Sequence, residues 1–308
     1  MSGELSRTSN TGTFDRVFTE VHHGESLELR NFHELRLFHL NVRNYSFSTN
    51  EFIKFLKKNI GGYVFSRAKI EGFKEEGDIQ GVRDEALRVM RRTGAPDSND
   101  TGNELGELLL YIFLEEKLKA PKLLSKVELS TDAMQYKSRC DGIHMRIDSE
   151  DGGTVYCQLV FGASNVIRNL KDAIDAAFET VQRIEGNECG EIQLIEQTIF
   201  DRRVNQHEAD FIRSVLIPSP DSHTHYDTAY GIFIGYTLGL SAEGRTAQEF
   251  RSKVNEKMER DIKEYAGYIR GKIAEHHLSG HSFYFYLLPM DDAEDDKKAI
   301  MDAIMGGV

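Results

Sequence analysis

The sequence contains no tryptophan, only five prolines and only three cysteines among its 308 residues. The cysteines (Cys140, Cys157 and Cys189) are odd in number and have no CxxC spacing, so neither a disulfide framework nor a zinc site is indicated. No apolar run approaches the roughly 20 residues that a membrane-spanning helix needs. The composition also excludes a disordered or fibrous chain. We therefore expect one large or two small domains with a substantial core.

Basic residues are also in the minority, because 38 Lys and Arg stand against 50 Asp and Glu, which gives a net charge of −12. Proteins that bind nucleic acid unaided usually carry a basic excess, since neutralised phosphates supply much of the affinity. The charge argues against a free-standing DNA-binding protein. It permits an enzyme whose partner contacts DNA, or a basic groove hidden by acidic surface elsewhere. The first 16 residues are polar and contain no signal-peptide segment, so we expect a soluble, cytoplasmic protein without a membrane partner.

Motifs for several common activities are missing as well. Neither GxxxxGK[ST] nor GxGxxG occurs, so nothing in the sequence indicates nucleotide binding. The serines lack the nucleophile-elbow pattern of α/β-hydrolases. The local histidine pairs His22–His23, His223/His225 and His276–His277 have no matching acid at known ligand spacing, and His207 lacks the second histidine of a zinc helix, which favours surface or loop positions for these residues.

What the sequence does contain is an alternation of helix and strand patterns, which predicts an α/β fold with a mixed central sheet flanked by helices. We expect a flexible leader over residues 1–15, an N-terminal α/β elaboration over 16–95, and a core over 96–308 that ends with a long helix and a strand. In the elaboration, a helix from Asn50 is expected to stop at Gly61–Gly62, before a short strand over 63–66. The core is expected to run in the order helix 104–119, strands 127–129, 140–147 and 154–162, helix 166–184, strand 230–240, helix 247–277 and strand 282–288.

Three acids in this core are candidate site residues. Glu104 and Glu107 are three residues apart, which places both carboxylates on one face of a helix that is otherwise apolar. A carboxylate there is costly to bury unless it is paired, hydrogen-bonded or bound to a cation, although acids in a first helical turn are also favoured by the helix dipole. Asp141 precedes Gly142 at the start of a strand, where turn chemistry is the alternative interpretation.

The end of the strand over 154–162 is where a metal-dependent nuclease needs an acid followed two residues later by a lysine. The acid would bind Mg²⁺ together with Asp141, and the lysine would orient water or stabilise phosphoryl charge. Two-residue spacing places both side chains on the same face of a strand. In this chain the corresponding residues are Ala163 and Asn165.

The ordered segments GNELGELLLY, CDGIHM, QLVFGASNV, AIDAAFETV, YGIFIGY and HSFYFYLLPMDD resemble the HamA effector family of Hachiman anti-phage defence, from about residue 25 to the end. That family is similar to the PD-(D/E)xK nucleases, so the resemblance implies a restriction-endonuclease-like core and Mg²⁺-dependent cleavage of DNA. By this resemblance, Glu104 or Glu107 matches the helix acid and Asp141 matches the strand acid. These residues are therefore the expected catalytic and metal-binding residues. Ala163 occupies the acid position and Asn165 the lysine position.

These two replacements imply an inactivated form. An engineered substitution and natural loss are open explanations, as is migration of the cation to the next helix, where Arg168 or Lys171 could reach back. The resemblance further implies a hetero-complex with a HamB-type superfamily 2 helicase that contacts most of the DNA and holds the effector in check. The alternative is a non-catalytic subunit that keeps the nuclease frame only to bind and regulate its helicase.

Overall fold

The computed structural model describes residues 5–43, 46–93, 103–125, 127, 138–149, 155–200, 206–216, 225–241 and 243–306. Its strands are β1 (Phe18–Val21), β2 (His33–Leu40), β3 (Val42–Arg43), β4 (Ser46–Phe47), β5 (Lys122–Ser125), β6 (Gly142–Ser149), β7 (Val155–Val166), β8 (His225–Thr237) and β9 (Ser282–Met290). Its helices are α1 (Phe14–Val17), α2 (Thr49–Val64), α3 (Arg67–Glu75), α4 (Ile79–Thr93), α5 (Asn103–Glu116), α7 (Leu170–Glu185), α8 (Glu188–Phe200), α9 (Gln206–Leu216), α10 (Ala247–Glu275) and α11 (Ala293–Met305).

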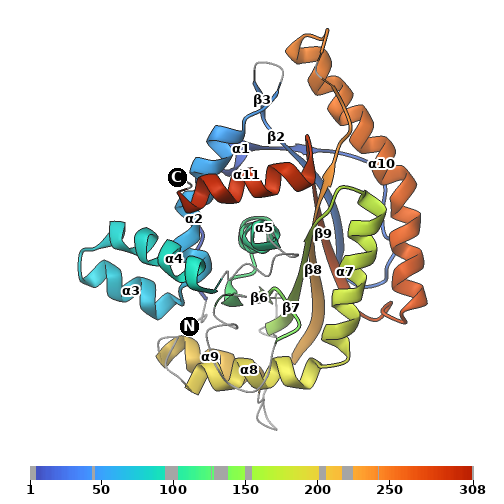
Figure 1. Cartoon of the computed structure of the whole chain (residues 1–308). Coiled ribbons are helices and arrows are strands. Elements are labelled where there is room, and N and C mark those ends of the chain that lie inside the picture. The colour runs from blue at the N-terminus through green and yellow to red at the C-terminus, as the bar shows by residue number, and fades with distance from the viewer. Residues whose placement is uncertain are drawn as a thin grey trace.

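A seven-stranded mixed sheet in the order β1-β2-β9-β8-β7-β6-β5 forms the centre (Figure 1). The inner strands β2, β9, β8 and β7 are parallel, whereas β1, β6 and β5 join antiparallel. Every residue of β9 is buried, as expected for a parallel strand covered on both faces. The predicted mixed α/β sheet is confirmed.

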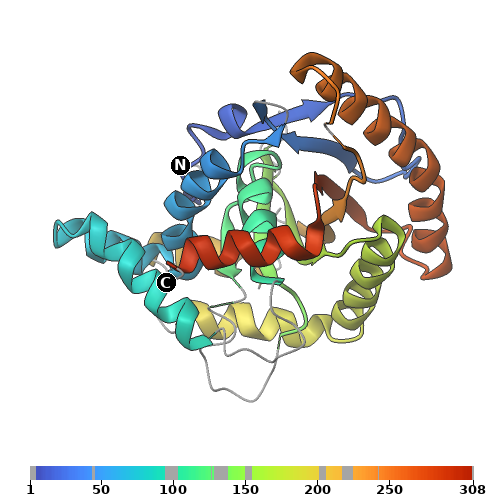
Figure 2. The same cartoon turned by 45° about the horizontal axis from the view of Figure 1, so that its top comes forward.

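Helices cover both faces of this sheet. On one face α5 packs against β7 and β8, with α2 and α11 beside it; on the other face α7 packs against the same two strands, with α10 outside it (Figures 1 and 2). Because α5 lies between the sheet and neighbouring helices, its apolar residues are buried all round. None of the helices in the described ranges combines the length and the apolar character that a bilayer crossing would require.

The core follows the predicted order of helix, three strands and helix, as α5-β5-β6-β7-α7. Its first strand, β5, lies upstream of the expected strand at 127–129, of which residues 128 and 129 fall outside the described ranges. Residues 94–102, at the boundary between the expected N-terminal elaboration and the core, also lie outside the described ranges.

The prediction for residues 61–66 is wrong, because α2 continues through both glycines to Val64 and no strand follows. The two glycines serve close packing instead of ending the helix. A Cβ on Gly61 would lie 2.5 Å from Val82 Cγ1, and one on Gly62 would lie 2.4 Å from both Thr8 O and Tyr111 Oη. Only glycine permits this approach, which the sequence alone could not distinguish from a helix stop.

Residues 6–13, expected within the flexible leader, are bound to the body of the protein; we call them the N-terminal segment. The Glu115 carboxylate accepts hydrogen bonds from the backbone N–H groups of Thr8 (2.8 Å) and Ser9 (2.6 Å). Asn59 Oδ1 accepts one from Asn10 N–H at 2.7 Å. Both acceptors are buried. The segment is therefore held by specific polar contacts.

Candidate functional site

The first turns of α5 approach the end of β7 closely, because residue 106 is a glycine. A Cβ at Gly106 would lie 3.2 Å from Ser164 Oγ and 3.4 Å from Val166 Cγ2. Ser164 and Val166 therefore face α5. This contact places the two acids of the helix next to the strand on which the candidate site was predicted.

Glu107 lies at this junction and is 8% exposed. Its Oε2 accepts a hydrogen bond of 2.6 Å from the hydroxyl of Tyr63, which is fully buried on α2. Burial raises the pKa of Tyr63 well above its ordinary value, and the negative charges of Glu107, Asp141 and Glu104 raise it further. All three predicted acids therefore act on the Tyr63 hydroxyl; two of them come from α5, and Asp141 directly precedes β6.

Asp141 is 7% exposed and binds the neighbouring strand. Its Oδ2 accepts hydrogen bonds from Ser164 N–H (2.7 Å) and Ser164 Oγ–H (2.9 Å), while its own N–H donates to Gly162 O at 2.9 Å. The preceding residues are fixed by Glu191 of α8, which accepts from Ser138 Oγ–H and Arg139 N–H. Asp141 is therefore a well-held carboxylate with two charge-assisted bonds.

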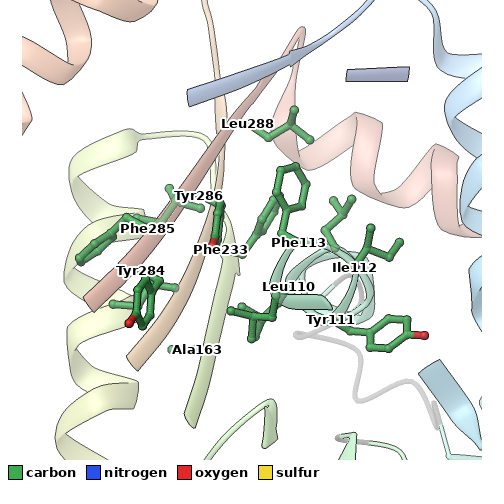
Figure 3. Packing of buried hydrophobic residues seen from close by; sticks show 14 of the residues in the cluster. Leu110, Tyr111, Ile112, Phe113, Ala163, Phe233, Tyr284, Phe285, Tyr286 and Leu288 are labelled. Atoms are coloured by element: carbon green, nitrogen blue, oxygen red, sulfur yellow. The ribbon is translucent and has the colours of Figure 1, made fainter. Parts of the chain in front are cut away.

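Ala163 and Asn165 lie on the other face of β7. Side chains alternate along a strand, so the neighbours of Ser164 point away from α5, toward the face that α7 covers. Figure 3 shows Ala163 on the far side of β7 from the α5 side chains Leu110 and Phe113. Ala163 is fully buried, and Asn165 Nδ2 is a buried atom without a hydrogen-bond partner in the described part of the chain. The structure thus brings Glu104, Glu107 and Asp141 together but separates them from the side chains at 163 and 165.

The two cations suggested as replacements for the lysine are engaged elsewhere. Arg168 Nη2 pairs with Asp292 at 3.1 Å, and Lys171 Nζ pairs with Asp175 at 2.9 Å. Lys171 lies on α7, which covers the same face of the sheet as Asn165, whereas Arg168 pairs with the N-cap residue of α11. Neither contributes charge at the carboxylate cluster.

The residues present do not fit a magnesium ion as they are arranged. Mg²⁺ requires near-octahedral oxygen ligation, usually with one or two carboxylates free to turn toward it. One oxygen of Asp141 is held by Ser164, and one of Glu107 by Tyr63. Within the described residues, no group of three or more His, Cys, Asp or Glu side chains is placed so that it could hold a metal ion.

Two residues of this site, Tyr63 and Ser164, were missed from the sequence. Tyr63 was assigned to a strand because it follows two glycines. Ser164 lies in a strand that is apolar on both faces, so periodicity does not show which face it occupies. The sequence signal that could have indicated Ser164 was its position between residues 163 and 165. Moving the expected acid–lysine motif by one residue along a strand transfers it to the opposite face, which is the face of Ser164.

Comparison with known proteins identifies a family. The family model described as HamA matches residues 15–304, which is almost the whole chain. No curated protein matches the sequence.

Proposed function

The chain belongs to the HamA family, and from this premise we propose that it is a Hachiman-type defence effector that keeps a nuclease-like frame without cutting DNA itself. Family membership alone makes it a Hachiman-type effector. The finer proposal is that it acts by binding a HamB-type superfamily 2 helicase within a hetero-complex. We assign it no phosphodiester hydrolysis and no bound magnesium.

The observation that carries this proposal is the hydrogen bonding of the Asp141 carboxylate. In a metal-dependent nuclease this carboxylate has to be available to a cation, together with an acid and a lysine on the neighbouring strand. Here the carboxylate binds Ser164 through both an N–H and a hydroxyl group. The residues at the expected acid and lysine positions, Ala163 and Asn165, carry no charge and, by alternation with Ser164, lie on the opposite face of β7.

An active Mg²⁺-dependent DNA endonuclease is the second candidate. Two observations favour it: the order α5-β5-β6-β7-α7 matches the expected nuclease core, and Glu104, Glu107 and Asp141 gather around Tyr63. On this view the register of the site on β7 is shifted by one residue, so that Ser164 and Val166 occupy its face.

A plasmid-nicking assay with Mg²⁺ or Mn²⁺ separates the two candidates. The wild-type chain, an Ala163→Glu/Asn165→Lys variant and a Ser164→Glu/Val166→Lys variant are compared with and without the helicase. Our proposal expects no nicking by the wild type in either condition. Nicking by the wild type that Asp141→Asn abolishes would refute it. Cleavage by only one of the double variants identifies the register of the ancestral site, and circular dichroism confirms that each variant is folded.

The partner is tested separately, by co-expressing the chain with the HamB-type helicase and isolating the complex by size exclusion. We expect a stable hetero-complex that Asp141→Asn leaves intact. Absence of a complex in the wild type would contradict the proposed role, whatever the cleavage assay shows.

A further inference from the structure

A groove of about 1550 Å³ opens where the N-terminal segment passes α2, α3 and the end of α5. The N-terminal segment is hydrogen-bonded to α2 through Gly62 and Asn59, and α3 and α4 project from the same side of the molecule as α2 (Figures 1 and 2). Small-molecule pockets are usually about 300 to 1,000 Å³. The groove is therefore larger than a typical small-molecule pocket and could hold part of a polymer. It lies near the C-terminal end of α5, whereas Glu104 and Glu107 lie near the N-terminal end.

The lining of this groove is basic although the chain as a whole is acidic. Nine Arg and Lys residues and four Asp and Glu residues line it, in a protein with a net charge of −12. Three of the four acids have cationic partners within 4 Å. These pairs are Asp15 with Lys117, Asp84 with Arg83, and Glu116 with both Arg7 and Lys119.

Five of the nine cations, by contrast, have no ion pair with any residue that the structure describes: Arg16, Lys54, Lys57, Lys58 and Lys74. Lys54, Lys57 and Lys58 are spaced i, i+3 and i+4 on α2, so their ammonium groups share one face of the helix. Like charges at this spacing repel one another and destabilise a helix. A polyanion in the groove would remove that repulsion.

The N-terminal segment supplies the opposite wall. The hydroxyls of Thr8 and Thr11 there donate to Glu115 and Glu116, so Ser6, Asn10 and Thr13 are the polar side chains that it offers to the groove. Such groups commonly contact phosphate oxygens in protein–DNA complexes. Because Glu115 and Asn59 hold this segment, and Arg67 Nε donates to Ser6 O at 2.7 Å, the wall is preformed.

The chemistry of the lining favours nucleic acid over an acidic protein. Protein interfaces are usually depleted in lysine and anchored by exposed aromatic residues. The one aromatic residue in this lining is Phe14, and it is buried. The absence of exposed aromatic rings from the lining also leaves no platform for stacking unpaired bases. We propose that this groove binds the phosphodiester backbone of a nucleic-acid duplex without reading its sequence, whether or not the chain cleaves it.

Fluorescence anisotropy of the full chain with a labelled random-sequence DNA duplex tests this, over roughly 50 to 200 mM salt. We expect binding at low salt that weakens steeply as salt rises. The triple variant Lys54→Gln/Lys57→Gln/Lys58→Gln should bind about tenfold or more weakly and reduce the slope of log K against log salt by about 3, since each phosphate contact contributes about 0.9.

The matched control is Lys253→Gln/Lys263→Gln/Lys298→Gln, which changes the net charge equally at exposed lysines outside the groove. It should bind the duplex like the wild type, and thermal melting confirms that both variants are folded. The proposal is overturned if the wild type does not bind, or if both triple variants lose affinity equally. Tighter binding of poly-glutamate than of DNA would also overturn it, because the groove would then suit an acidic protein.

Discussion

Glu107 and Glu115 lie just over two turns apart on α5, and both are buried, yet their surroundings differ. Glu115 receives Thr8 N–H, Thr8 Oγ–H, Ser9 N–H and Lys122 N–H, so it joins the N-terminal segment and β5 to the helix. Glu107 receives the Tyr63 hydroxyl and lies beside two further carboxylates. A buried acid that accepts backbone N–H groups is an anchor of the fold, whereas Glu107 accepts a side-chain hydroxyl and is a candidate site residue.

Removing the Glu115 carboxylate should have the largest effect on stability. Glu115→Ala leaves several buried donors without their acceptor, so we expect the free energy of unfolding to fall by about 4 kcal/mol. Glu115→Gln keeps one acceptor oxygen and should cost about half as much. Urea denaturation measures both, and the comparison fails if Glu115→Ala is no more damaging than Glu107→Ala.

Acid should also weaken the Glu115 end of the helix, through His144. Burial lowers the pKa of His144 to about 4, although its bond to Ala120 O and the charge of Glu115 act in the opposite direction. The unfolded chain takes up this proton near pH 6.5 and the folded chain only near pH 4, so stability present above pH 6.5 is lost as the pH falls through this window.

The linkage relation gives a loss of about 2 kcal/mol at pH 5 from this residue. Urea denaturation at pH 7 and pH 5 tests it, with His144→Gln as the control that lacks the titrating group. The pH dependence of the control should be smaller by that amount. Identical curves for the two proteins would show that His144 does not contribute.

At the other end of α5, Tyr63→Phe removes the hydroxyl that donates to Glu107. We expect a loss of about 1 to 2 kcal/mol, since the bond is buried and its acceptor is a carboxylate. Glu107→Gln and the double variant complete a thermodynamic cycle. The coupling energy should exceed about 0.5 kcal/mol if the contact is direct, and an additive cycle would argue against it.

Ser164→Ala should give the smallest effect, about 1 kcal/mol or less, because Ser164 N–H still binds Asp141 when the hydroxyl is gone. Thermal melting measures this change. If Ser164→Ala lowered the free energy of unfolding as much as Glu115→Ala does, Asp141 would also be an anchor of the fold. The contrast between the Glu107 end and the Glu115 end of α5 would then disappear.

Much of the fold was predictable because its elements have strong periodicity. The apolar runs of β8 and β9 and the stripe of α7 mark buried strands and an amphipathic helix. The roles predicted for Glu104, Glu107 and Asp141 stay predictions. The course of α2 past Gly61 was not predictable, because a glycine required by close packing resembles one that ends a helix.

The groove was beyond sequence reasoning for a different reason. Its cations come from segments far apart in the chain, such as Arg16, Lys54 and Lys119, and each stands in a locally ordinary context. A net charge averages over the whole surface and cannot show where the cations of this groove meet. Only the fold determines that grouping.

The position of β9 has a consequence for biosynthesis. This strand lies between β2 and β8, yet β2 ends at Leu40 and β9 begins only at Ser282. During synthesis at about 5 to 20 residues per second, β2 has to wait on the order of ten seconds or longer for its parallel neighbour. Throughout that interval one edge of the nascent sheet stays open to mispairing. We therefore expect fragments that end before residue 282 to aggregate, because they lack β9.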